Sequence, residues 1–155
     1  MRAFFYDTWA FIALANADDP HHDLCAEGDR ALEEGGYVAT TSDYVLDETL
    51  TGLHVGAGSR VALELADLVE ARIAGGDLKL LEVTSERRAE ALRTFRRLCP
   101  KSPRLSFTDC TSFVLMRELR MTAAFTADRH FHLAGGGIRP LLERHKGILR
   151  WKAPD

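Results

Sequence analysis

The chain has 155 residues, a length that suits one domain in which roughly 70% of the unfolded surface is buried on folding. No stretch approaches the roughly 18 apolar residues of a membrane span, and residues 1–2 lead straight into a strand-like run rather than a signal peptide. The three cysteines form no CxxC pair, which argues against a zinc site and a disulfide framework. We therefore expect a cytoplasmic protein without a membrane anchor.

The net charge of −3 conceals an asymmetry along the chain. Residues 1–78 contain four Lys or Arg against fifteen Asp or Glu, whereas residues 79–155 contain sixteen against eight. This division is compatible with two oppositely charged solvated surfaces. It is equally compatible with a basic surface beside an acidic pocket, where phosphates dock while a metal ion sits at the reacting bond.

Predicted strands and helices alternate along the first half of the chain. A short, nearly continuous apolar run predicts a buried strand at 2–6. Helices follow at 9–15 and 21–34, the first ended by an Asp-Pro turn and the second by Gly35-Gly36. We expect a strand at 37–40, a helix at 42–55 with Ser42 as its N-cap and, after a glycine-rich break, a helix at 59–74.

The second half continues the alternation. We expect a strand at 79–83, a basic amphipathic helix at 84–99, a loop at 100–104, a helix at 106–120, a strand at 122–127 and a final strand at 138–142. The alternation, without a tight hairpin signal, predicts an α/β fold with a mostly parallel sheet covered on both faces. No repeat or long linker divides the chain, so residues 1–155 are expected to form a single domain. Residues 143–155 are a basic C-terminal tail with no predicted structure.

Four acidic side chains lie where such a sheet opens a ligand-binding cleft. Asp7 and Asp128 each follow a predicted strand, Asp109 begins a predicted helix, and Glu48 lies in the helix after the second strand. If these ends meet, two carboxylates about 5 Å apart repel by roughly 3 kcal/mol at an effective dielectric of about 20. Such a cluster must hold a cation or take up protons, and all-oxygen sites suit Mg²⁺ or Mn²⁺.

Each acid also has a simpler interpretation. Asp7 can cap the following helix, Asp109 can complete a capping box that begins at Ser106, Asp128 can form a turn, and Glu48 can be a surface residue.

Helical periodicity bears on two of these positions. Asp109 shares a helical face with Phe113 and Met116, and a carboxylate on a buried face must be paired or metal-bound. Periodicity does not distinguish Glu48 from Asp47, because the two residues flank the apolar stripe about equally.

In these features the chain resembles the PIN-domain family, especially the VapC-type toxins of bacterial toxin–antitoxin pairs. The similar segments are 5–8 (FYDT), 42–50 (SDYVLDETL), 105–110 (LSFTDC) and 125–131 (FTADRHF), with 19–22 (DPHH) before the second helix. They cover nearly the whole chain in order. One departure is Trp9, two residues after Asp7, where the family often has Ser or Asn.

The resemblance implies an α/β/α sandwich with metal-dependent endoribonuclease activity. The implied catalytic and Mg²⁺- or Mn²⁺-binding residues are Asp7, Glu48, Asp109 and Asp128, with Thr126 in a supporting position. This match, rather than periodicity, selects Glu48 over Asp47. A metal-activated water would attack the phosphorus, so no nucleophilic side chain is needed. The resemblance also implies an RNA substrate, a cognate antitoxin and a homodimer.

Basic and imidazole side chains are secondary candidates. Arg129, next to Asp128, is a candidate for steering phosphate. The dense basic stretch at 87–104 can line an RNA path or form a solvated helix face. The histidines are expected to be loop or helix-end residues, because no HExxH or other metal-binding pair occurs.

Three other functions stay open. A PIN nuclease can process RNA without being a toxin, and a catalytically silent PIN-like scaffold can bind RNA or protein. An α/β phosphatase would also place acids around Mg²⁺ at strand ends, but it usually needs a second Asp where this chain has Trp9.

Overall fold

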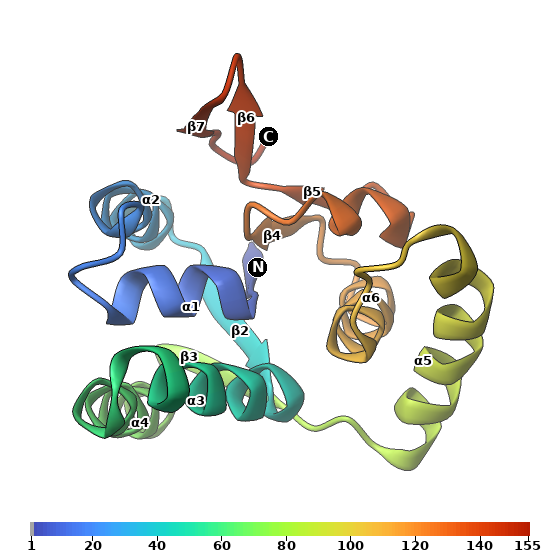
Figure 1. Cartoon of the computed structure of the whole chain (residues 1–155), viewed down its shortest axis with the longest axis horizontal. Helices are drawn as coiled ribbons and strands as arrows, with labels where there is room; N and C mark the ends of the chain where they lie inside the picture. Colours follow the sequence, from blue (N-terminus) through green and yellow to red (C-terminus); the bar gives the residue numbers. More distant parts are fainter. Residues whose placement is uncertain (1) are drawn as a thin grey trace.

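A five-stranded parallel sheet forms the centre of the protein in the computed structural model, which describes residues 2–155 (Figure 1). Its strands are β1 (Ala3–Tyr6), β2 (Val38–Ser42), β3 (Leu78–Leu81), β4 (Ala123–Phe125) and β5 (Arg139–Pro140), in the order β3-β2-β1-β4-β5. All four strand pairings are parallel. The mostly parallel sheet predicted from the sequence is therefore confirmed.

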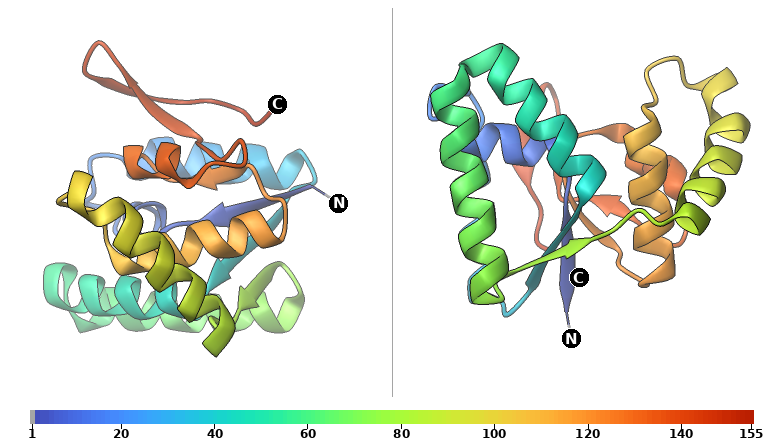
Figure 2. Two further views of the ribbon diagram at one scale, coloured as in Figure 1. Left: turned by 90° about the vertical axis from the view of Figure 1, so that its right-hand side faces the viewer. Right: turned by 90° about the horizontal axis from the view of Figure 1, so that it is seen from below.

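Helices cover both faces of this sheet. They are α1 (Thr8–Ala15), α2 (His22–Glu34), α3 (Asp43–Ala57), α4 (Ser59–Gly75), α5 (Ser85–Leu98) and α6 (Phe107–Glu118), with short 3-10 helices η1 (Cys99–Lys101) and η2 (Arg129–Ala134). Helices α3 and α4 lie on one side of the sheet and α5 and α6 on the other (Figure 2, right). The three-layer α/β/α arrangement is confirmed, and each predicted helix begins and ends within two residues of the observed one.

Burial explains the apolar runs in β1 and α6. Phe4, Phe5 and Tyr6 are fully buried because β1 is the central strand and has helices on both faces. In α6, every residue from Asp109 to Met116 is buried, because this helix packs between the sheet and α5 (Figure 2, right). The carboxylate of Asp109 is thereby held inside the protein.

The C-terminal residues form a structure that the sequence analysis did not predict. Strands β6 (Leu142–His145) and β7 (Ile148–Trp151) pair antiparallel, with β7 in contact with α2, and their turn projects beyond the rest of the molecule (Figure 1). The two residues between them, Lys146 and Gly147, have φ values of 49° and 82°. Positive φ at both central positions is typical of a two-residue hairpin turn. The predicted final strand at 138–142 is wrong in extent, since β5 has two residues and Leu142 already belongs to the hairpin.

Among residues 2–155, none of the helices combines the length and the apolar character needed to cross a membrane. Cys25, Cys99 and Cys110 are all free thiols in the structure.

Candidate active site

The four predicted acids come from four separate segments. Asp7 directly follows β1, Asp128 lies just beyond β4, Asp109 is in the first turn of α6, and Glu48 is in α3. Strand β1 has β2 on one side and β4 on the other, so the order of the sheet reverses there and a crevice opens at the carboxyl ends of the strands.

Asp7 is the most deeply buried of the four, with 4% of its surface exposed. Its Oδ2 accepts a hydrogen bond from Thr126 Oγ1 at 2.8 Å, and Thr126 Oγ1 accepts one from the backbone N–H of Asp128 at 3.0 Å. The Asp7 side chain does not cap α1, so the simpler interpretation is wrong for this residue. Within residues 2–155, no basic side chain lies within 4.0 Å of its carboxylate. A buried carboxylate without a cationic partner calls for a bound counter-charge or a proton.

Asp109 belongs to a helix cap and to the acidic cluster at once. Its Oδ2 accepts a hydrogen bond from the backbone N–H of Ser106 at 3.0 Å, while Ser106 Oγ accepts one from the N–H of Asp109 at 2.9 Å. The predicted capping box is therefore confirmed. The same Oδ2 atom also lies 4.0 Å from Nδ1 of His130. The two interpretations weighed for Asp109 apply to one and the same carboxylate.

Asp128 and His130 stand beside Asp109. Oδ1 of Asp128 accepts a hydrogen bond from the backbone N–H of His130 at 2.9 Å and so caps η2. Nδ1 of His130 lies 2.9 Å from the same oxygen, yet this buried atom makes no hydrogen bond within residues 2–155. Asp109, Asp128 and His130 each offer one ligand atom, and these atoms lie within 4.8 Å of one another.

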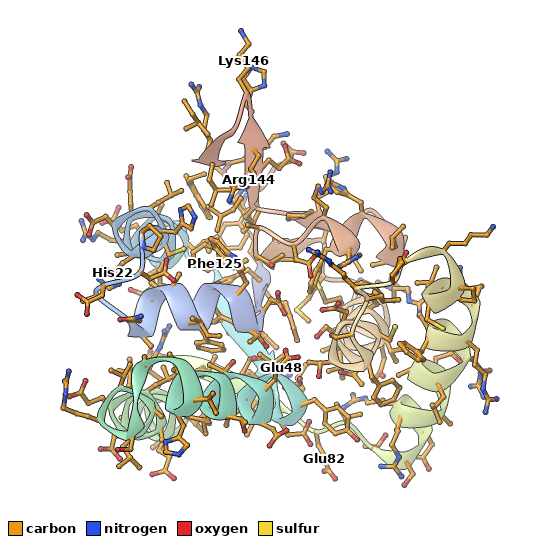
Figure 3. All side chains as sticks on the ribbon, in the orientation of Figure 1. His22, Glu48, Glu82, Phe125, Arg144 and Lys146 are labelled. Carbon is orange, nitrogen blue, oxygen red and sulfur yellow. The ribbon has the colours of Figure 1, made fainter. Side chains whose placement is uncertain are left out.

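Glu48 is held toward Asp7 through Thr8. Oγ1 of Thr8, the residue after Asp7, donates a hydrogen bond to Oε2 of Glu48 at 2.5 Å. Glu48 is half-buried and lies on the side of α3 nearer α6 (Figure 3), whereas Asp47 is exposed. The structure thus separates the two acids that helical periodicity could not.

Two residues of this site were missed by sequence reasoning. His130 was expected only to be a loop or helix-end residue, and Thr8 was part of a matched segment without a role. The spacing of Asp128 and His130 by two residues after a strand is a signal that could have placed His130 in the cluster. A single hydroxyl such as that of Thr8 has no recognisable pattern.

Burial and mutual repulsion raise the pKa of two of the acids. Burial, followed by repulsion from Asp109, raises the pKa of Asp7 to about 7, although the hydrogen bond from Thr126 lowers it. Burial raises the pKa of Asp109 to about 6, against the lowering effect of its Ser106 hydrogen bonds and with added repulsion from Asp128 and Glu48. Near neutral pH, this cluster therefore holds a proton unless a cation takes its place.

The donor set fits a divalent cation. Asp109 and Asp128 supply oxygen ligands of the kind that Mg²⁺ and Mn²⁺ prefer, and Nδ1 of His130 adds one nitrogen beside them; Asp7 and Glu48 are not part of this close group among residues 2–155. An imidazole donor is more typical of transition metals than of Mg²⁺. The chemistry of these groups supports hydrolysis of a phosphate ester by a metal-activated water.

Comparisons with known proteins show the family of the chain. Residues 4–136 match the family model of the PIN domain. The chain is 30% identical over 131 residues to the 23S rRNA-specific endonuclease VapC20 of Mycobacterium tuberculosis, a match that spans 84% of this chain and 93% of the relative. The crystal structure of M. tuberculosis VapC20, described as a sarcin-ricin loop cleaving toxin, has a TM-score of 0.72 at 30% identity and covers 88% of this chain and 99% of that one.

VapBC2 of Rickettsia felis, solved bound to a DNA fragment from its promoter, has a TM-score of 0.66 at 14% identity and covers 88% of this chain and 96% of that one. This second likeness shows the fold alone. From the family match over residues 4–136 and the 30% identity with a curated relative, the chain belongs to the PIN-domain family.

Proposed function

We propose that this protein is a metal-dependent endoribonuclease that hydrolyses phosphodiester bonds in RNA, and that it is the toxin of a toxin–antitoxin pair. The observation that carries the proposal is that Asp109, Asp128 and His130 offer ligand atoms within 4.8 Å of one another, beside a buried Asp7 that Thr126 ties to the backbone of Asp128 and that has no basic partner within residues 2–155. Membership of the PIN family supports the nuclease activity. The 30% identity with a 23S rRNA-specific endonuclease makes large-subunit rRNA the first substrate to test.

Mg²⁺ or Mn²⁺ is the proposed cofactor. Asp7 and Asp109 would be direct ligands, and Glu48 and Asp128 would complete the site directly or through water, since Mg²⁺ usually keeps several waters. When bound there, the ion supplies a water of lowered pKa and neutralises charge that builds up on the scissile phosphate.

Three hydroxyl groups position the proposed ligands. Thr126 orients Asp7 and ties it to the backbone of Asp128, while Thr8 orients Glu48. Ser106 fixes Asp109 through the capping box. Such outer hydrogen bonds commonly change metal affinity or activity about 10- to 100-fold when they are removed. Arg129 is exposed beside Asp128 and is proposed to steer phosphate toward the site.

The test is cleavage of total RNA by the purified protein in Mn²⁺ or Mg²⁺, with EDTA and Asp109→Asn as negative controls. We expect discrete metal-dependent cuts in rRNA and a loss of at least about 100-fold in Asp109→Asn. Glu48→Gln and Asp47→Asn form a matched pair, because each removes one charge from adjacent positions of α3 and only Glu48 contacts Thr8. Glu48→Gln should lose cleavage, and Asp47→Asn should keep it. RNA that stays intact in both metals would refute the nuclease.

A homodimer and an antitoxin complete the proposal. Val55 on α3 and Leu63 and Leu68 on α4 are 81%, 64% and 54% exposed, and these apolar side chains are the ones that a second copy is proposed to cover. An antitoxin that presents an arginine to the carboxylates would compete with the metal ion for the same oxygens.

A further inference from the structure

The β6–β7 hairpin lies outside the part of the chain that matches the PIN family model, which ends at residue 136. It projects beyond the helices, with Lys146 at its tip and Arg144 nearer its base (Figures 2 and 3). The hairpin is therefore an element of this chain beyond the matched residues.

The hairpin is firmly attached at its base. The ring of Trp151 packs edge-on against Phe125 of β4, with 5.5 Å between the ring centres. On its other side the ring lies so close to α2 that a Cβ atom added at Gly28 would be 2.7 Å from Trp151 Cε3. Leu142 and Leu149 are buried, with 1% and 8% of their surfaces exposed. These contacts fix the direction in which the hairpin points.

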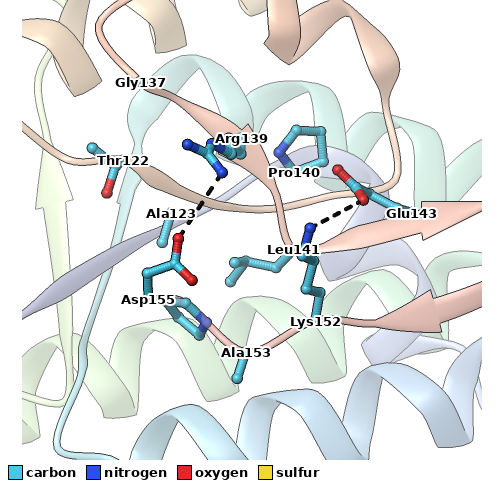
Figure 4. A pocket seen from close by; sticks show the side chains of 11 residues that line it. Thr122, Ala123, Gly137, Arg139, Pro140, Leu141, Glu143, Lys152, Ala153 and Asp155 are labelled. Carbon is cyan, nitrogen blue, oxygen red and sulfur yellow. Dashed lines mark ion pairs between the residues drawn. The ribbon is translucent and has the colours of Figure 1, made fainter.

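The residues after β7 also contact the base of the hairpin. The backbone N–H of Lys152 donates a hydrogen bond to the carbonyl of Leu141 at 2.8 Å. The final residues then run back along β5, where Asp155 lies 3.9 Å from Arg139 and Lys152 lies 3.6 Å from Glu143 (Figure 4). The hairpin is consequently an ordered part of the molecular surface.

A groove of about 950 Å³ connects the hairpin with the proposed active site. Asp128 and His130 line it, and so does Arg144 of β6. Two further arginines, Arg104 before α6 and Arg129 at the start of η2, belong to the same lining. Three segments distant in sequence thus bring arginines to a groove that opens at the acidic cluster.

The arginines of this groove are not neutralised. Arg104, Arg129 and Arg144 are exposed, and within residues 2–155 none of them forms an ion pair. Glu143, the second acid of the lining, lies 3.6 Å from Lys152 and 3.9 Å from His132 and is thus already paired. The groove therefore presents positive charge beside the carboxylates that would hold a metal ion.

We propose that this groove binds the sugar-phosphate backbone of the RNA on one side of the cleaved bond, with Arg144 of the hairpin contacting a phosphate there. This proposal rests on the proposed nuclease function. Guanidinium groups bind phosphate oxygens through paired hydrogen bonds, and contacts to the backbone add affinity and fix the register of the RNA without reading its sequence. The hairpin is then a substrate-binding arm of this chain.

The test measures RNA binding without cleavage, by fluorescence anisotropy of a labelled single-stranded 20-nucleotide RNA of mixed sequence in EDTA. The variants are Arg144→Ala, Arg144→Glu and, as a matched control, Arg150→Ala. Arg150 is exposed on the same hairpin but does not line the groove. We expect Arg144→Ala to weaken binding about 5- to 30-fold and to reduce the slope of log affinity against log salt by about 0.7, the value for one phosphate contact on a single strand. Arg144→Glu should weaken binding further, and Arg150→Ala should change it less than about twofold.

Equal affinities and salt slopes for Arg144→Ala and Arg150→Ala would overturn the proposal. It would also be overturned if Arg144→Glu bound RNA normally but no longer captured the antitoxin, because the groove would then receive a protein. Cleavage of total RNA by the unaltered protein separates this inference from the proposed function. If the unaltered protein cleaves RNA and the Arg144 variants bind RNA as well as it does, the groove proposal is refuted and the nuclease stands. If RNA binding depends on Arg144 but the unaltered protein does not cleave RNA, the groove proposal stands and the nuclease is refuted.

Discussion

At the scale of single residues, the acidic side chains proposed for catalysis lower the stability of the metal-free protein. Asp7 and Asp109 are 4% and 6% exposed, and burial together with repulsion from neighbouring carboxylates raises the pKa of both. Without a cation, their ionisation inside the protein opposes folding, because the unfolded chain solvates the same charges freely. The arrangement that prepares a metal site therefore destabilises the metal-free protein.

We predict that Asp7→Asn stabilises the metal-free protein at pH 7.5 while it abolishes cleavage. The pKa of Asp7 is raised to about 7 in the folded protein from 3.8, so the folded state binds more protons and the free energy of unfolding falls as pH rises from about 4 to about 7. The variant should lose this contribution and gain at least about 1 kcal/mol at pH 7.5, or roughly 2–4 °C in Tm.

Thermal melts in EDTA at pH 5 and pH 8 measure this effect, and Asp47→Asn on the exposed side of α3 is the control. Excess Mn²⁺ should stabilise the unaltered protein more than Asp7→Asn. An Asp7→Asn variant that melts at the same temperature and with the same pH dependence as the unaltered protein would show that Asp7 carries no buried charge.

The sequence located the four acids, but their contacts could not be predicted. Asp7, Asp109 and Asp128 stand at strand ends and at a helix start, where the physics of a parallel sheet places ligand sites. The choice of Glu48 over Asp47 needed the family resemblance, because the helical pattern treats both alike. The role of Thr8 depends on a contact between residues 40 positions apart, which no local pattern encodes.

At the scale of elements, the hairpin packs so closely on α2 that the helix needs a residue without a side chain at Gly28. Replacing Gly by Ala inside a helix usually stabilises it by about 0.5–1 kcal/mol. At Gly28, however, the new Cβ would lie 2.7 Å from the Trp151 ring. We predict that Gly28→Ala lowers the free energy of unfolding by about 1–3 kcal/mol, the usual range for overpacking.

Gly52→Ala in α3 is the matched control for this prediction. Its Cβ would meet Ile12 Cδ1 at 3.5 Å, an ordinary contact, so the substitution should stabilise the protein by up to about 1 kcal/mol. Chemical denaturation of both variants makes the comparison. Equal gains in stability would mean that the hairpin does not pack on α2 as described.

Sequence patterns predicted the helices well but failed for the hairpin and for the extent of β5. Helices were well predicted because side chains such as those of Ser42, Thr84 and Ser106 mark their starts through hydrogen bonds to backbone N–H groups. The hairpin was missed because its turn residues, Lys146 and Gly147, lack the Asn or Asp that usually precedes glycine in such turns. Strand β5 was overextended because apolar character continues through Leu142 although parallel pairing ends at Pro140.

At the scale of the whole molecule, we predict that the protein is a homodimer. Val55 and Leu63 are 81% and 64% exposed on α3 and α4, and a second copy would cover them. Light scattering should give twice the chain mass of 17.3 kDa. Leu63→Glu should shift the protein toward the monomer, whereas Leu92→Glu should not, since Leu92 is also exposed, at 41%, but lies on α5. A mass of one chain at every concentration would contradict the dimer.

The charge asymmetry read from the sequence also belongs to this scale. The acidic first half contributes Asp7 and Glu48, and the basic second half contributes Arg104, Arg129 and Arg144 around the groove. Composition alone left two oppositely charged solvated surfaces as an equal possibility. Only the fold, which brings the end of β1 next to the end of β4, places the two kinds of charge side by side.

The position of β1 in the sheet has a consequence for the moment during synthesis at which the acidic site can form. β1 is made first, yet one of its two neighbours, β4, ends at Phe125, and the last acid follows at residue 128. The site cannot assemble until the ribosome has added the residues from β1 to Asp128, which takes roughly 6–25 s at about 5–20 residues per second. Under the proposed toxin function, an antitoxin made alongside the chain has that interval in which to be ready.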